Sequence, residues 1–213
     1  MEQKKNKRKK NHSLISDIRK EQIIEATISV IGETGYSNAS LANIAKKADV
    51  STALISYYFP SKKDLADLLL KELIKRKITY IGKQMKEVDA PTEKLFAYIH
   101  ANLSYSINHP SEGAAITELV FNAKDKNKEL YYQSESDDSY LLEEIIKMIQ
   151  MNGGFPNLNA KSLSIMIKGA VKEYAIQQTL EKIDQKTYDK ELISIISRLT
   201  GFSKKYTIEP LKK

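Results

Sequence analysis

Helical spacing of the apolar residues is the feature that most constrains how this chain can fold. Ile23, Ala26, Val30 and Ile31 recur at intervals of three and four residues, which places them on one face of a helix. Comparable stretches follow along the chain. No segment alternates apolar and polar residues between hairpin turns, as a half-buried strand would. The chain is therefore predicted to be all-α.

Capping residues and prolines set the expected helix boundaries. A first helix is predicted over 16–34, and Ser40 and Ser51 are each placed to cap a short helix. The second short helix should end at Phe59, because proline disfavours a helical conformation at the preceding residue. Ser61 and Asp64 resemble a capping box that starts a longer helix, to about residue 88. Later helices are predicted over 92–106, 110–123, 131–150, 159–182 and 187–200.

Positive charge is concentrated in the first third of the chain. The net charge is +7, and up to Asp64 there are 12 Lys/Arg against 7 Asp/Glu (+5), which leaves 22 against 20 (+2) for the rest. This asymmetry suggests a polyanion partner, either nucleic acid or an anionic membrane surface. The basic tail, residues 1–15, is expected to be a disordered solubilising segment or a DNA-contacting arm, and it lacks the apolar face of a membrane-surface helix.

Composition argues against several classes of protein. There are no cysteines, which excludes disulfides and thiolate metal sites and favours the cytoplasm. His12, His100 and His109 lack metal-ligand spacing, so no metal or other cofactor is expected. No phosphate-binding loop, dinucleotide fingerprint or nucleophile elbow occurs, so an enzyme is not expected. Neither a signal peptide nor an apolar run of about 18 residues is present, so no membrane association is expected.

The two short helices form a candidate helix-turn-helix, whose second helix would lie in a DNA major groove. On a helical wheel, Ile55, Tyr58 and Phe59 face the core. Uncharged and mostly small groups lie on the other side, so that face suits a groove better than bulk water. Leu54 could meet a thymine methyl, and Thr52 or Ser56 could bond base edges. The residues expected at the DNA are Ser40, Ser51, Thr52, Ala53, Leu54, Ser56, Tyr57 and Lys62.

Paired lysines at the start of the fourth helix strengthen the DNA hypothesis. Lys62 and Lys63 lie where the helix dipole is positive, which is locally unfavourable by a few tenths to about 1 kcal/mol. A bound phosphate would reverse that sign, because it would meet free backbone N–H groups and an ammonium together. Tyr57 and Ser40 could donate hydroxyl groups to neighbouring phosphates.

The segment from Arg19 to about Leu70 resembles the N-terminal domain of the tetracycline-repressor (TetR/AcrR) family of bacterial regulators. The matching elements are Ile24-x-Ala26, Gly35-Tyr36, Ile44-Ala45, Val50-Ser51 and Tyr58-Phe59-Pro60-Ser61-Lys62 running into Leu65. Asp49 replaces the usual turn glycine and is expected to adopt a left-handed backbone. Ala39, Asn43 and Ser56 are further departures from the family pattern.

The resemblance implies a homodimer that binds a partly palindromic operator on double-stranded DNA. It also implies repression that ends when a small molecule enters the C-terminal domain. The expected division is a basic arm (1–15), a helix-turn-helix domain (16–64) and an effector-binding and dimerisation domain (65–213). The last two long helices would form the dimer interface through Leu163, Ile167, Val171, Tyr174, Leu192, Ile195, Ile196 and Leu199, although core packing within one subunit is an equally open use of these residues.

A ligand pocket would have to lie among the C-terminal helices. Candidate lining residues combine apolar walls with polar tips: Phe96, Ile99, His100, Leu103, Glu118 and Phe121. Two rival functions remain open at this point. One is a DNA-binding adaptor of the same fold that recruits a protein partner without a small-molecule effector. The other is a helical enzyme with a basic tail.

Overall fold

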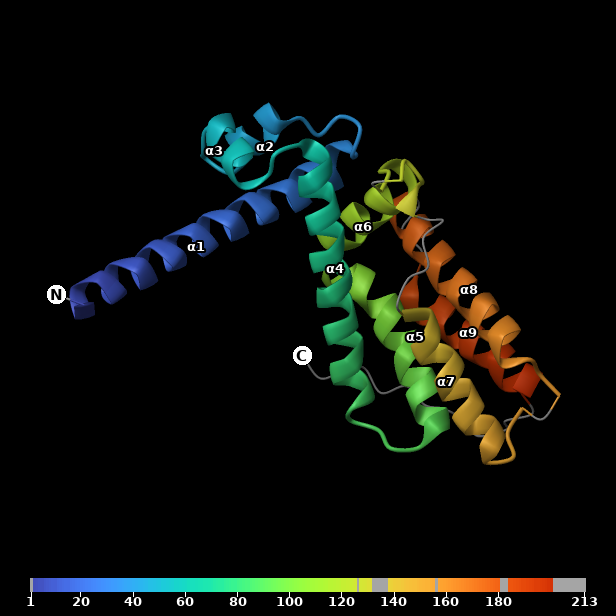
Figure 1. Ribbon diagram of the computed structural model, residues 1–213. Helices are drawn as coiled ribbons and strands as arrows, with labels where there is room; N and C mark the ends of the chain where they lie inside the picture. The colour runs from blue at the N-terminus through green and yellow to red at the C-terminus, as the bar shows by residue number, and fades with distance from the viewer. Residues whose placement is uncertain (1, 126, 132–137, 156, 181–183, 201–213) are drawn as a thin grey trace. The chain divides into compact units, whose positions relative to one another are not determined.

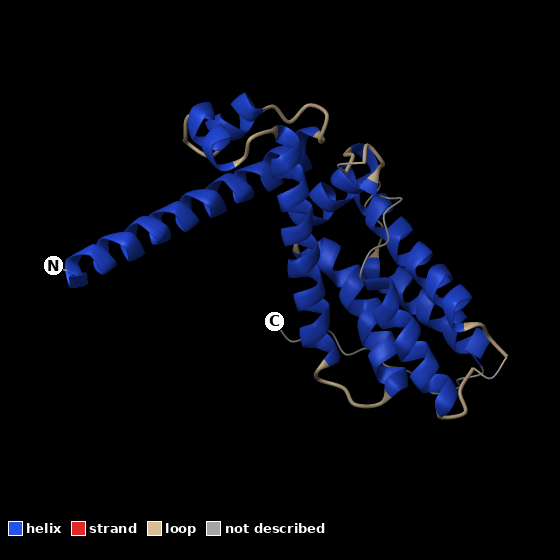
Figure 2. Ribbon diagram, viewed as in Figure 1, coloured by secondary structure: helices blue, strands red, loops and turns tan. Residues whose placement is uncertain are grey.

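The structure is a computed structural model that describes residues 2–125, 127–131, 138–155, 157–180 and 184–200. All its regular elements are helices, as Figure 2 shows, and the only β pairing among these residues is an isolated bridge between Lys124 and Leu130. The all-α prediction is confirmed. Among the same residues, no helix combines the length and apolar character that crossing a membrane requires.

The chain divides into two compact units, and the first comprises Met1–Lys77 and Tyr105–Glu135. Figure 1 labels its helices, which are α1 (Glu2–Thr34), α2 (Leu41–Lys47), α3 (Thr52–Tyr58), the first part of α4 (Lys62–Met85), the end of α5 (Pro91–Asn108) and α6 (Pro110–Asn122). Ile23, Ile31, Ile44, Ile55 and Leu69 form the centre of its core.

Helix α6 belongs to the same core as the helix-turn-helix, which differs from the expected division after residue 64. Its Ala115 and Leu119 are fully buried in the cluster that contains Ile23 and Ile31 of α1. At Gly32 of α1, an added Cβ would lie 3.2 Å from the backbone oxygen of Ser111. The close approach of α1 and α6 therefore depends on a glycine, and this long-range contact has no local sequence signature.

The expectation of a disordered basic arm is not met. Helix α1 begins at Glu2, so the backbone of residues 2–15 continues the helix predicted from Ser16. No glycine or proline lies between Glu2 and Ile31. Lysine and arginine are good helix formers, so nothing local ends the helix at the basic segment.

The second unit comprises Ile78–Ser104 and Ser136–Lys213. It contains the end of α4, most of α5, α7 (Asp138–Met151), α8 (Ala160–Leu180) and α9 (Gln185–Thr200). Leu95, Ile99, Leu142, Ile146 and Leu163 are among its most buried core residues. The predicted boundaries of its helices are close to the observed ones where the structure describes them. The described part of α7 begins at Asp138, and residues 132–137 of the helix predicted over 131–150 lie outside the described residues.

Candidate nucleic-acid interface

Serine hydroxyls cap both short helices as the sequence predicts. The Ser40 hydroxyl accepts a hydrogen bond from the Asn43 backbone N–H at 3.1 Å, and Ser51 accepts one from Leu54 at the same distance. Each hydroxyl uses an acceptor lone pair in its cap and keeps its own hydrogen as a donor. Both serines are exposed, so capping is compatible with their predicted role as phosphate donors.

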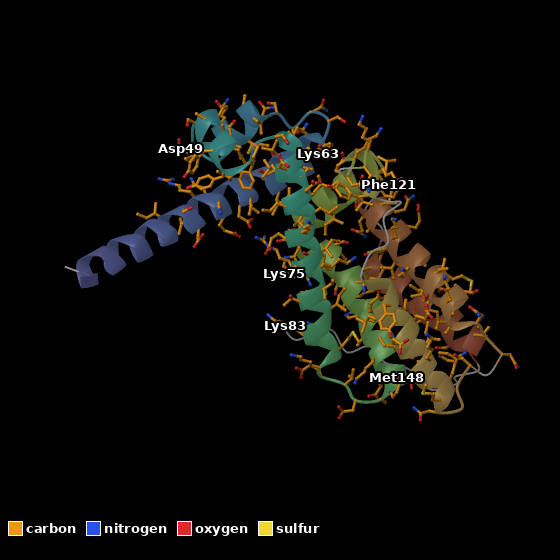
Figure 3. All side chains as sticks on the ribbon, viewed as in Figure 1. Asp49, Lys63, Lys75, Lys83, Phe121 and Met148 are labelled. Carbon is orange, nitrogen blue, oxygen red and sulfur yellow. The ribbon has the colours of Figure 1, made fainter. Side chains whose placement is uncertain are left out.

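The turn between α2 and α3 is held by an unusual backbone conformation. Asp49 has a φ of 51°, the left-handed value expected for it from the sequence. Val50 N–H donates to the Ala45 carbonyl at 3.0 Å, and the Gln22 side chain donates to the Ala48 carbonyl at 2.6 Å. Helix α1 thus fixes the turn, and the Asp49 side chain remains exposed beside α3 (Figure 3).

Helix α3 has the two faces that its sequence predicts. Ile55 and the C-terminal capping residue Phe59 are buried, whereas Tyr57 is 76% exposed. The remaining predicted contact residues include one half-buried side chain, Leu54, and four exposed ones, Ser51, Thr52, Ala53 and Ser56. The exposure of this face is confirmed, and its contact with DNA stays a prediction.

Lys62 has a different environment from the one predicted. Its ammonium donates to the Tyr36 carbonyl at 2.6 Å and lies 4.5 Å from the centre of the Tyr36 ring. Burial lowers the pKa of Lys62. In this conformation Lys62 joins the start of α4 to the turn after α1, instead of reaching out to a phosphate.

The neighbouring Lys63 is the better candidate for phosphate contact. It lies in the first turn of α4, where Figure 3 labels it. Within the part of the chain that the structure describes, its ammonium makes no hydrogen bond or ion pair. Residues 61–64 also form the predicted cap, because the Ser61 hydroxyl donates to the Asp64 carboxylate at 2.7 Å and accepts the Asp64 N–H at 3.1 Å.

Sequence reasoning missed several basic groups around the helix-turn-helix. Lys46 and Lys47 are exposed in the last turn of α2, and Lys47 also pairs with Glu33 at 3.0 Å. The Lys20 ammonium lies 5.7 Å from the centre of the Tyr58 ring. The two lysines of α2 could have been found as cations near a helix C-terminus. The Lys20 contact depends on tertiary structure.

Arg76 on α4 gathers carboxylates from three helices of the first unit. Its guanidinium lies 2.6 Å from Glu21 and 2.7 Å from Glu25 on α1, 3.1 Å from Glu112 on α6, and 3.4 Å from Glu72 one turn earlier on α4. Burial opposes the charge of Arg76, but the hydrogen bonds and negative charges of Glu25 and Glu112 raise its pKa. We name these five residues the Arg76 cluster.

Glu118, which was predicted to line a ligand pocket, binds the turn after α1. Its carboxylate accepts the Tyr36 backbone N–H at 3.0 Å. It also lies beside Gly35, whose φ of 80° requires a residue without a side chain. Glu118 and Phe121 both belong to α6 in the first unit, and Figure 3 labels Phe121.

The other predicted pocket residues lie on α5 in the second unit. Phe96, Ile99 and Leu103 are core residues there, and His100 is partly buried and paired with Asp189. The six predicted residues therefore do not form one cluster within either unit. Within the second unit, the structure brings together the four from α5.

Most residues predicted for the dimer interface belong to the core of the second unit. Six of them are buried there: Leu163, Ile167, Val171, Tyr174, Leu192 and Ile196. Ile195 is 52% exposed. The side chain of Leu199 lies outside the described part of the chain. Of the two uses left open by the sequence, core packing is the observed one for these six.

Comparisons with known proteins agree with this geometry. Residues 23–69 match the family model of the bacterial regulatory proteins, tetR family. The HTH-type transcriptional regulator BetI of Vibrio atlanticus (strain LGP32) is 35% identical over 88 residues, which are 40% of this chain and 44% of that protein. The chain spans about half the length of the curated relatives it matches.

Solved structures extend the likeness to the fold of both units. The fatty acid degradation regulator FadR from Bacillus halodurans is 26% identical, with a TM-score of 0.70 over 83% of this chain and 96% of that one. A transcriptional regulator from Saccharomonospora viridis in complex with choline is 20% identical, with a TM-score of 0.74 over 85% and 96%. Residues 23–69 are therefore similar to the tetR family of bacterial regulatory proteins, and the chain has the fold of the solved regulators it was compared with.

Proposed function

We propose that this protein is a sequence-specific DNA-binding transcriptional regulator that acts as a repressor. The observation that carries the proposal is the exposed, uncharged face of α3, held by capped ends and a turn fixed from α1, within the residues that match the family model. An α-helix with small exposed side chains fits a major groove, and the flanking lysines supply sequence-independent attraction to phosphates. As a repressor of chromosomal genes it would act in the cytoplasm.

A small molecule that binds the second unit would release the repressor from DNA. This part of the proposal is supported by α4, which contributes Lys62–Lys77 to the first unit and continues as one helix into the second. The choline complex of the Saccharomonospora viridis regulator is consistent with it. An effector that favours a DNA-incompetent conformation by about 1–3 kcal/mol would weaken operator binding by roughly 5–150 fold.

The active species would be a homodimer that pairs through exposed residues of α8 and α9. On α8, Ile165 and Met166 are 56% and 55% exposed, outside the face formed by the buried Leu163 and Ile167. Tyr188 on α9 donates to the Ala170 carbonyl at 2.8 Å, which aligns the two helices. Because the chain reverses between α8 and α9, Ile195 is expected at the level of Ile165 and Met166. Ile195 belongs to the interface predicted from sequence, and Ile165 and Met166 are new to it.

Footprinting on the DNA upstream of the gene tests the proposal. The protein is added across a series of salt concentrations, with random duplex as competitor. The expected result is one protected, roughly two-fold symmetric site that survives the competitor. Binding that is diffuse, steeply salt-dependent and equal on random duplex would contradict sequence-specific regulation, because the basic segment alone would then account for it.

A further inference from the structure

A buried carboxylate in the second unit has one oxygen without a partner. Asp189 on α9 is 3% exposed. Its Oδ2 is paired with Nδ1 of His100 on α5. Its Oδ1 is also buried, and no group in the described part of the chain donates a hydrogen bond to it.

An unpaired carboxylate oxygen in a protein core is costly and calls for an explanation. Buried polar groups in folded proteins are nearly always hydrogen-bonded, and buried charges are nearly always compensated. Among the described residues, His100 is the one cationic or potentially cationic side chain paired with Asp189. With a neutral imidazole, the pair carries a charge of −1 and retains acceptor capacity on Oδ1.

Two neutral tyrosines lie near Asp189, and the pKa of one of them reports negative surroundings. Tyr174 and Tyr188 lie with ring centres 4.8 Å apart. Burial, followed by the negative charges of Asp184 and Asp189, raises the pKa of Tyr174 to about 12. The hydroxyl hydrogen of Tyr188 is used on the Ala170 carbonyl, so it does not serve Asp189.

The same groups are suited to a cation. Faces of aromatic rings attract cations, and a desolvated carboxylate attracts them more strongly. The His100 side chain is 17% exposed, so the Asp189–His100 pair reaches the surface at its imidazole side. A ligand that carries phosphates, such as an acyl-CoA, would bring negative charge toward the Asp189 carboxylate, whose Oδ1 has no donor among the described residues.

We propose that Asp189, with the rings of Tyr174 and Tyr188, forms the recognition site for a small organic cation that carries an N–H or O–H group. That group donates to Oδ1 of Asp189, and His100 holds the carboxylate through Oδ2. This inference rests on the proposed function, because the cation is the effector that the repressor would sense. The chemical class follows from the carboxylate, which is negatively charged and has a free acceptor oxygen.

Isothermal titration on the full chain tests the chemical class directly. The probes are choline and ethanolamine, each beside a neutral counterpart of similar shape, 3,3-dimethylbutan-1-ol and ethylene glycol, with stearoyl-CoA as the anionic alternative. The dissociation constant of at least one cation is expected to be lower than that of its neutral counterpart by about a factor of ten or more. Asp189→Asn keeps the shape of the side chain and should remove that preference. Glu191→Gln, which neutralises an exposed carboxylate of α9, should leave it intact.

Three results would overturn the inference. They are equal binding of each cation and its counterpart, a preference that survives Asp189→Asn, and binding of stearoyl-CoA alone. The comparison of each cation with its neutral counterpart uses the wild-type chain, so it tests the inference even if the Asp189→Asn variant does not fold. Gel-shift assays of the same preparations on the footprinted DNA separate the two proposals. If the protein binds the operator but prefers no cation, only the cation site is contradicted. If it prefers a cation but binds no operator, the proposed repressor function is contradicted and the cation site stands.

Discussion

Two neighbouring lysines at the start of α4 have different surroundings, and substitutions should separate their roles. Lys62 donates to the Tyr36 carbonyl, whereas Lys63 makes no such bond in the described structure. Lys62→Met should lower the free energy of unfolding by about 1 kcal/mol, because a charge-assisted hydrogen bond is lost from a half-buried site. Lys63→Met should leave stability unchanged and weaken binding to all duplexes. Urea unfolding and salt-dependent DNA titration measure these effects, and equal loss of stability in both variants would contradict the assignment.

The side chains of α3 should affect which DNA is bound. Thr52 is exposed and Leu54 is half-buried on the outer face of the helix. Thr52→Ala or Leu54→Ala should change the preference between operator and point-mutated operators by about 1–3 kcal/mol, since these groups would contact base edges or a thymine methyl. Lys63→Met serves as the control, because a lost phosphate contact weakens all sequences alike. Competition titrations measure the ratio. An unchanged ratio in both alanine variants would show that another face reads the bases.

Tyr174 should make stability depend on pH in the alkaline range. Its pKa is raised to about 12 from the ordinary 10.0, first by burial and then by nearby negative charges. The folded state therefore holds this proton more tightly than the unfolded state. The resulting stabilisation is complete below pH 10 and is lost as the pH rises toward 12. Tyr174→Phe should show a smaller loss of unfolding free energy between pH 9.5 and 11.5, and a loss as large as in the wild type would contradict the shift.

At the residue scale, contacts between residues close in the sequence could be predicted, and contacts between residues far apart in the sequence could not. Ser40 and Ser51 cap their helices as expected, because a cap involves residues three apart. Asp49 adopts its left-handed conformation for an equally local reason. Lys62 bonds a carbonyl 26 residues away, and no pattern around it indicated that contact.

Among the helices, the Arg76 cluster is expected to hold α1, α4 and α6 together. Arg76→Met removes one cation from four carboxylates and leaves them to repel one another. Since the guanidinium side chain is 23% exposed, solvent screens part of the effect, and a loss of about 2 kcal/mol in unfolding free energy is expected.

Lys75→Met is the matched control for Arg76→Met. The Lys75 side chain is 78% exposed, and its ammonium lies 4.0 Å from Glu72. Surface ion pairs of this kind contribute about 0–1 kcal/mol, so the control should unfold nearly as the wild type does. Urea titrations of both variants measure the difference. Equal stability of the two variants would show that the Arg76 cluster does not stabilise the first unit.

At the element scale, helix existence was predictable and helix partners were not. Periodicity identifies α6, but not that Ala115 and Leu119 complete the core of the helix-turn-helix. Glu118 looked like a pocket residue because it shares helical spacing with apolar neighbours, yet it binds the Tyr36 N–H across 82 residues. The start of α1 was predicted too late because a run of lysines was interpreted by its charge and not by its helix propensity.

For the whole molecule, the exposed apolar residues of α8 and α9 predict how the subunits pair. Ile165→Glu should convert the dimer to a monomer, because a carboxylate at the centre of an apolar interface would be buried without a partner. Light scattering coupled to gel filtration measures the mass. Met148→Glu, at a residue of α7 that is also exposed (Figure 3), is the control and should remain dimeric. A dimer that survives Ile165→Glu and Ile195→Glu together would place the interface elsewhere.

The sequence located these helices but not their outward faces. Leu163, Ile167 and Val171 share a helical face that suits a core or an interface equally, because both bury apolar side chains. The structure assigns that face to the core of the second unit and leaves Ile165 and Met166 outside. Two adjacent apolar residues outside the main stripe were the available signal, and periodicity alone gives them little weight.

Selection from a random duplex library tests the central claim most directly, because every possible operator sequence competes in the same experiment. If the exposed face of α3 reads DNA in a dimer, repeated rounds of binding should enrich one two-fold symmetric sequence. Its half-sites should lie about one helical turn apart, roughly 34–36 Å. Thr52→Ala should enrich a sequence altered at the same position in both half-sites. A library that shows no enrichment, while salt-sensitive binding persists, would contradict the claim that this protein is a sequence-specific regulator.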